Sequence, residues 1–242
     1  MFMEKRGASH VEIILAFVLF IAVVGFALYF FYPGNSDRVV DSTMDYTFRE
    51  IKKNASVEIE SYRVEITGTS IPNPLAIQIA KVNNEKKARV KDVSGTVLSS
   101  KIEEGTENDF VIIGSTGLTD GNIIFVDISD DFTAYSPSPG TATHDDALYD
   151  IISYDSEEMI SEKRIALLKS KYDLDYLNLK REFNLPDRAN FGFVLNFDSG
   201  TEDISAERNI ASGLEVFTAR ERVKVLNSDG EAEFAELTIS IW

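Results

Sequence analysis

Cysteine is absent from this chain of 242 residues, and histidine occurs only twice. Without cysteine the chain forms no disulfide, no iron–sulfur cluster and no thiolate nucleophile. His10 lies near the N-terminus and His144 stands before two aspartates, which is too few ligands for a histidine-based metal site. A chain of this length can bury an adequate core without disulfides, so their absence is compatible with an ordered domain.

Positive charge is also scarce. The chain has 24 Lys and Arg against 40 Asp and Glu, which gives a formal net charge of −16 at pH 7. Proteins that bind the phosphate backbone of a nucleic acid need a basic surface to neutralise its charge, so we expect no nucleic-acid partner. The same imbalance argues against broad electrostatic docking of the outer part on anionic lipid.

Motifs that mark common active sites are missing. The sequence has no Gly-x-Ser-x-Gly turn, no phosphate-binding loop and no His-Glu-x-x-His segment. Two acidic groups offer the oxygen ligands that calcium prefers, without the spacing of a twelve-residue calcium loop: Asp127, Asp130 and Asp131, and Asp198, Glu202 and Asp203. We interpret both groups as solvated loop carboxylates and predict no enzyme, no metal and no cofactor. A glycosidase carboxylate pair has no fixed spacing and stays open.

Against these absences stands one long uncharged run, from Ile13 to Tyr32. Its length matches the roughly 20 helical residues that span a hydrocarbon core of about 30 Å, and Pro33-Gly34 ends it. A secretory signal has an apolar region of only about 7–15 residues, followed by a small-residue cleavage site. We therefore predict a retained transmembrane helix with membrane lipid as a partner.

The charges that flank this run predict its orientation. Lys5 and Arg6 precede it, whereas the first positive charge after it is Arg38. Cytoplasmic flanks carry the excess of Lys and Arg, so the N-terminus is expected inside the cell and the bulk of the chain outside. No second run of comparable length occurs, which predicts a single-pass protein of the cell membrane.

The residues before the run form a set: the basic pair Lys5-Arg6, then Gly7, the small residue Ala8, and Glu12 at the edge of the uncharged stretch. This set resembles the type III signal peptides of type IV pilins and of related archaeal pilins. The resemblance is confined to this N-terminal segment. It has departures, because the leader is very short and the processed chain would begin with Ala, where many bacterial pilins have Phe and many archaeal ones Gln.

This resemblance implies that a prepilin-type peptidase cuts between Gly7 and Ala8. Residues 1–7 would be the leader and residues 8–34 the transmembrane helix through which subunits assemble. In such filaments the apolar helices pack into a central bundle, and Glu12 would pair there with the free amine of a neighbouring subunit. The implied partners are the peptidase and like or related pilin subunits.

A second helical segment is predicted over residues 35–54, where Met44, Phe48 and Ile51 recur at three- or four-residue spacing. By the resemblance, this segment is the outer extension of the pilin helix, offset by a kink at Pro33-Gly34. Asn54-Ala55-Ser56 is a glycosylation sequon, which makes Asn54 the candidate acceptor in an outward-facing chain.

Residues 55–242 are predicted to form a β-rich, mainly antiparallel exterior head with a helical insertion, which places the chain in the α+β class. Residues 56–67 alternate as a strand does, with a phase slip near Ser61 that we interpret as a bulge. Further strands are expected at 75–82, 88–99, 110–113, 123–128 and 191–197. A C-terminal hairpin is expected from residues 222–226 and 231–242, joined through Asp229-Gly230.

The helical insertion is predicted to begin at Ser156 and to carry an apolar stripe from Met159 to Tyr172, with a shorter piece over 173–183. Residues 134–146 are rich in Pro, Ser, Gly and Thr and are predicted to be a loop. The head has the length of one domain or of two, and this loop is the candidate division.

Two function classes fit these observations. In the first, the protein is a pilin-like structural subunit of a cell-surface filament or secretion machine, and its large head favours a minor or tip pilin. In the second, it is a monomeric single-span surface protein whose exterior is a binding module or an unrecognised enzyme domain. Gly7, Ala8 and Glu12 separate the two, since an ordinary membrane anchor needs none of them.

Overall fold

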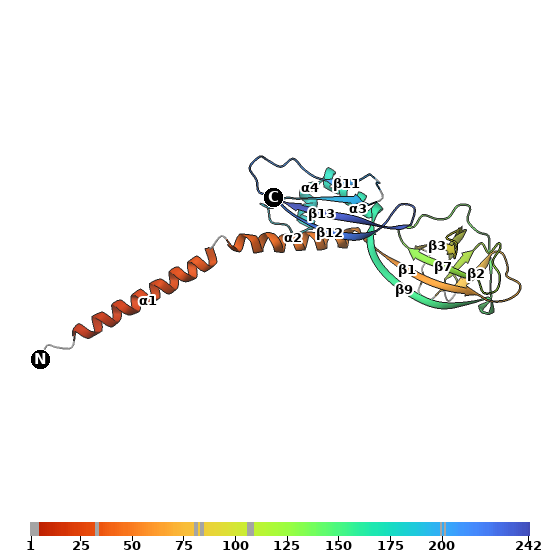
Figure 1. Ribbon diagram of the computed structural model, residues 1–242, viewed down its shortest axis with the longest axis horizontal. Helices are drawn as coiled ribbons and strands as arrows, with labels where there is room; N and C mark the ends of the chain where they lie inside the picture. Colours follow the sequence, from red (N-terminus) through yellow and green to blue (C-terminus); the bar gives the residue numbers. More distant parts are fainter. Residues whose placement is uncertain are drawn as a thin grey trace. The chain divides into compact units, whose positions relative to one another are not determined.

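A computed structural model of the chain describes residues 5–31, 34–79, 82, 85–105, 109–198, 200 and 202–242. The chain divides into two compact units, residues 1–46 and 47–242, here called unit 1 and unit 2. Its architecture is an N-terminal apolar helix followed by a mostly β-rich domain with a few helices (Figure 1).

Two helices occupy the N-terminal part of the chain. The first, α1 (Lys5–Phe31), is uninterrupted, and its segment Val11–Tyr29 is long and apolar enough to cross a membrane. The second, α2 (Gly34–Ala55), begins in unit 1 and ends in unit 2. Thr47, Ile51 and Ala55 recur at four-residue spacing and are buried, which is the stripe of an amphipathic helix. The predicted kink falls partly on residues 32 and 33, which lie outside the described residues.

Unit 2 is built on two sheets. The larger contains, in spatial order, β11 (Ile204–Ala206), β10 (Phe191–Phe197), β13 (Ala232–Ile241), β12 (Phe217–Leu226), β9 (Tyr149–Ser161), β1 (Ser56–Ile66), β7 (Ile123–Ser129), β3 (Lys87–Asp92) and β4 (Val97–Leu98). The smaller contains, in spatial order, β5 (Ser100–Glu103), β6 (Phe110–Ile113), β2 (Leu75–Gln78) and β8 (Thr143–His144). All pairs are antiparallel except β12 with β9 and β2 with β8.

Strand β1 contributes to both hydrophobic cores of unit 2. Its first half buries one face of the strand and its second half buries the other face. Val57 and Ile59 point into a small core with Met159 and Leu226, whereas the second half of the strand turns its other face to the main core. The phase slip near Ser61 is therefore a change of buried face. Strand β1 has no bulge at Ser61 itself, since its pairing with β7 runs without interruption from Glu60 to Glu65. The nearest irregularity is a register shift with β9 between Arg63 and Val64.

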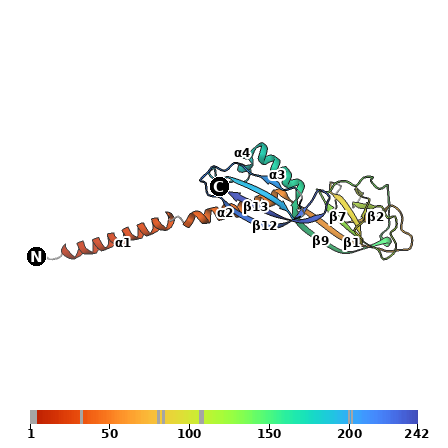
Figure 2. The ribbon, with the colours of Figure 1, turned by 45° about the horizontal axis from the view of Figure 1, so that its top comes forward.

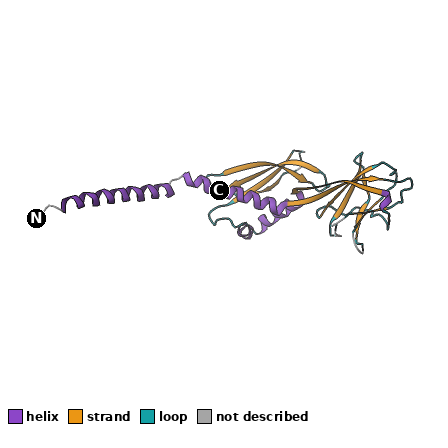
Figure 3. Cartoon of the chain, turned by 90° about the horizontal axis from the view of Figure 1, so that it is seen from below, coloured by secondary structure: helices purple, strands orange, loops and turns teal. Residues whose placement is uncertain are grey.

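The main core lies where the two sheets face each other. It is formed almost entirely by aliphatic side chains from β1, β2, β3, β6 and β7, among them Val64, Ile77, Val90, Val111 and Val126, all fully buried. Along β1, β3 and β7, buried residues alternate with more exposed ones, so each strand turns one face to the core. Two sheets that each bury one face pack together as a sandwich. Figure 3 shows almost only strands and loops at this end of unit 2.

The other end of unit 2 carries helices. Helices α3 (Glu162–Leu174) and α4 (Tyr176–Glu182) lie near β12 and β13 (Figures 1 and 2). Tyr172 fixes their packing: its ring meets those of Tyr176 and Phe191 edge-on, and its hydroxyl donates to the Phe191 carbonyl at 2.7 Å. Burial raises the pKa of the Tyr172 hydroxyl, which keeps it a donor.

The predicted start of the helical insertion at Ser156 was wrong. Strand β9 continues through Met159 and Ile160 to Ser161, and helix α3 begins only at Glu162. Eleven residues of β1 pair with β9, and this long-range pairing overrides the local preference of Glu and Met for helix. Strand β3 likewise ends at Asp92, where a turn at Gly95 leads into β4, so residues 88–99 are two strands.

The loop at residues 134–142 does not divide unit 2 into separate sheets. Strand β1 pairs on one side with β7, which precedes the loop, and on the other with β9, which follows it. One sheet therefore contains strands from both sides of the loop. The predicted strands at 110–113 and 191–197 match β6 and β10, and the C-terminal hairpin forms from β12 and β13.

Candidate functional site

The most distinctive surface of the described chain is helix α1. Most of its large apolar side chains are exposed, and their exposed fraction ranges from 52% for Ile21 to 72% for Tyr29. They point to all sides of the helix, because the span Val11–Tyr29 is apolar throughout and none of it is buried. Such a helix is stable only against lipid or other apolar helices, because exposing this area to water is costly.

Glu12 is the one residue among Asp, Glu, Lys, Arg and His within Val11–Tyr29. It lies near the start of the span and is exposed. A carboxylate costs roughly 2.5–3.5 kcal/mol at the centre of a bilayer and less near its edge, so its position tolerates membrane contact. In an apolar bundle the same group requires a positive partner.

The predicted processing residues lie in the first turn of α1. The helix begins at Lys5, so the backbone of Gly7 and Ala8 is helical. By the resemblance the peptidase would cut ahead of the membrane-spanning part, and residues 7 and 8 do precede Val11. Cleavage there would leave nearly the whole apolar segment attached to the chain.

Asn54 lies at the end of α2, with its side chain exposed. Its Nδ2 donates to the Glu50 carbonyl at 2.8 Å, and this single bond closes the last turn. Ser56, the third residue of the sequon, begins β1 and bonds the Glu158 carboxylate through its hydroxyl. The asparagine is therefore accessible, but glycosylation has to replace one capping bond.

His144 belongs to a small polar cluster rather than a metal site. Its Nε2 lies 2.8 Å from Asp146 Oδ1 and 3.0 Å from the Tyr149 hydroxyl, and its ring packs on Phe110. The Tyr149 hydroxyl also accepts from the Gln78 backbone N–H at 2.9 Å. Burial raises the pKa of Tyr149, so its hydroxyl stays neutral and joins β2 to the start of β9.

Each of the two acidic groups considered as calcium ligands includes carboxylates that pair with an arginine. Arg164 Nε donates to Asp131 at 2.8 Å and its Nη2 lies 3.7 Å from Asp130, while Arg222 pairs with Asp198 at 2.7 Å. Among the described residues no three His, Asp or Glu side chains come close enough together to hold a metal ion. Asp131 is the buried partner of Arg164, whereas the pair between Arg222 and Asp198 is largely exposed and contributes little to stability.

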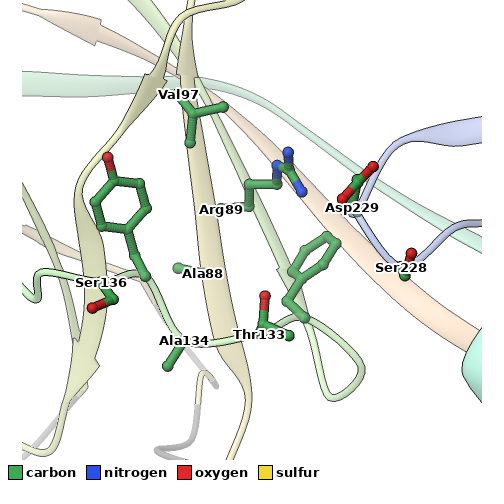
Figure 4. A pocket seen from close by; sticks show the side chains of 11 residues that line it. Ala88, Arg89, Val97, Thr133, Ala134, Ser136, Ser228 and Asp229 are labelled. Carbon is green, nitrogen blue, oxygen red and sulfur yellow. The ribbon is translucent and has the colours of Figure 1, made fainter.

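Unit 2 also contains a polar pocket of about 290 Å³ between β3, the segment after β7 and the β12–β13 turn (Figure 4). Arg89 extends toward Ser228 and Asp229 of the turn, and Thr133 and Ser136 lie on the opposite side (Figure 4). Arg89 Nη2 also bonds Glu231 at 3.2 Å, and the Arg89 Nε is buried without a hydrogen-bond partner.

This pocket can hold a small hydrogen-bonding molecule or water. Its polar lining, with Arg89, Thr133, Ser136 and Asp229, offers hydrogen-bond donors and acceptors to such a molecule. Sequence reasoning missed it because Arg89, Thr133 and Asp229 come from three distant segments, and no spacing rule links them. Comparison with known protein families, characterised proteins and solved structures finds no match for the chain.

Proposed function

We propose that this chain is a pilin-like structural subunit that assembles through its N-terminal apolar helix into a cell-surface filament or secretion machine. The large β-rich head suits a minor or tip subunit better than a major one. The N-terminus would be cytoplasmic and unit 2 extracellular. A monomeric single-span surface protein with a binding head is the alternative.

The observation that carries the proposal is Glu12 in the span Val11–Tyr29, which has no other charged residue and no buried residue. A simple anchor gains nothing from a carboxylate at this position, whereas a bundle of such helices can use it. After cleavage at Gly7, the new amine of Ala8 would lie about one helical turn from Glu12 along the sequence. The amine of one subunit and the carboxylate of the next could then neutralise each other and fix their axial register.

The first test is the N-terminal residue of the protein purified from its native membrane, measured by intact mass and terminal peptide sequencing. A chain that begins at Ala8 supports processing by a prepilin-type peptidase. A Gly7→Leu variant should then remain uncleaved but inserted, because the apolar segment is unchanged. A native chain that retains residues 2–7 would contradict the proposal.

A second test addresses assembly. In Glu12→Ala the membrane fraction should keep the protein, while its incorporation into sheared filaments should be lost. Removing one partner of a buried ion pair costs about 3–5 kcal/mol, because the remaining charge is left without a partner. Val11→Ala, which trims the neighbouring exposed side chain, is the matched control and should assemble. Normal assembly of Glu12→Ala would leave the single-span alternative.

A further inference from the structure

Strand β9 has a long outer edge that is available for pairing. On one side it pairs with β1 from Tyr149 to Ile160. On the other it meets β12 only at Ile160 and Ser161. Within the part of the chain that the structure describes, no strand pairs with its outer edge from Asp150 to Glu158. The backbone N–H and C=O groups that point outward there are the usual template for an added strand.

The side chains of this edge are unusually apolar for an exposed strand. Residues 150–158 are all exposed, and they include Ile151, Ile152 and Tyr154, at 43%, 48% and 57%. The register with β1 shifts by one residue near Ile152. Tyr149, Ile151 and Tyr154 therefore lie opposite Ile66, Val64 and Tyr62, on the face that continues the main core.

The opposite face of the same edge is acidic. Across the shift at Ile152, Asp150, Asp155 and Glu157 share this face, and the edge 150–158 has four carboxylates and no Lys or Arg. Glu157 pairs with Lys224, while the Asp155 carboxylate accepts from the Ser156 N–H that follows it. Pairing this edge with the same edge of a second copy would oppose like charges, which is destabilising.

We propose that the outer edge of β9 binds an extended segment of a partner protein, in which apolar residues alternate with lysine or arginine. The segment would add as a strand, place its apolar side chains beside Ile151 and Tyr154, and set its basic side chains against Asp150 and Asp155. Backbone bonds would supply affinity and the two faces would supply specificity. This surface lies in unit 2 and does not depend on the assembly of α1.

The probe is a nine-residue capped peptide in which valine alternates with lysine and threonine, added to the full-length protein in detergent micelles. We expect saturable binding by fluorescence anisotropy, together with slower amide hydrogen exchange confined to residues 150–158. A peptide with glutamate in place of lysine, and one of the same composition with the alternation scrambled, should bind about tenfold more weakly because they lose the cross-strand pairs.

Charge reversal locates the site. Asp150→Lys with Asp155→Lys should weaken binding of the lysine peptide about tenfold and improve binding of the glutamate peptide. Glu202→Lys with Glu215→Lys changes the net charge equally at exposed positions elsewhere in unit 2, and is the matched control. Thermal melts of both variants should match that of the unaltered protein, since all four side chains are exposed.

Three outcomes would overturn the proposal. The first is no saturable binding of the lysine peptide. The second is equal weakening by the two charge-reversal pairs, which would indicate long-range attraction to an acidic protein. The third is a concentration-dependent dimer, measured by light scattering, that Asp150→Lys with Asp155→Lys alters; the occupant would then be a second copy of the chain.

Discussion

Tyr62 is the first residue of β1 whose side chain belongs to the main core, and its hydroxyl is 3.4 Å from Glu60 Oε2. Burial, reinforced by the charge of Glu60, raises the pKa of Tyr62 from 10.0 to about 12. Above pH 10 the unfolded chain therefore loses this proton before the folded chain does. Stability that is complete below pH 10 is lost as the pH rises toward 12.

We expect the free energy of unfolding to fall from pH 10 to pH 12, and to fall less steeply in Tyr62→Phe. Chemical denaturation at a series of pH values measures both slopes. Burial also raises the pKa values of Tyr149, Tyr172 and Tyr176, so some decline should persist in the variant. Identical slopes for the two proteins would show that Tyr62 does not contribute.

Gly230 occupies a position in the β12–β13 turn that disfavours any other residue. Its φ is +76°, and a Cβ there would overlap the guanidinium of Arg89 and lie 3.2 Å from its Cδ. Gly230→Ala should cost about 1–3 kcal/mol, measured by urea unfolding. Gly140→Ala is the control, because a Cβ there meets nothing within 4 Å. Equal stability of the two variants would contradict this assignment.

At the scale of elements, Ser161 joins a strand to a helix. It is the last residue of β9 and the N-cap of α3, where its buried Oγ accepts from the Arg164 N–H at 3.3 Å. Ser161→Ala should cost about 1 kcal/mol of unfolding free energy, since the cap is lost. Ser170→Ala, on the exposed side of the same helix, should be neutral or slightly stabilising, because alanine is the better helix former.

The junction between the two ends of unit 2 depends on one arginine as well as on the small core. Arg164 donates to Asp131 and, through Nη1 at 2.6 Å, to the Ser56 carbonyl at the start of β1. It therefore connects α3, the segment after β7 and the first residue of the central strand. Contacts between segments so distant in the sequence have no local signature.

At the scale of the whole molecule, we expect the chain to differ in solubility with and without helix α1. Unit 2 has its own buried cores, whereas the apolar surface of the chain is concentrated on α1. A chain that begins at Gly34 should therefore be folded and monomeric without detergent, as measured by circular dichroism and light scattering. The full chain should require micelles. A need for detergent in the shortened chain would mean that unit 2 exposes a further apolar surface.

Much of the chain's organisation was predictable from local patterns. The uncharged run from Ile13, the stripe of α2 and strands such as β6 and β10 each depend on residues adjacent in the sequence. Period and composition specify such elements because the physical cause, burial of one face or immersion in an apolar medium, acts on every residue of the segment alike. Glu12 also stands out without any structure, because it lies directly before a long uncharged segment.

Tertiary structure alone decided the rest. The last part of β9, from Ser156, was predicted to be the start of a helix, and the pairing of β9 with eleven residues of β1 makes it a strand instead. The change of buried face at Ser61 arises because two different cores meet one strand. The pocket at Arg89 brings three distant segments together. Such features follow from long-range contacts, whose energies exceed local propensities and leave no periodic trace in the sequence.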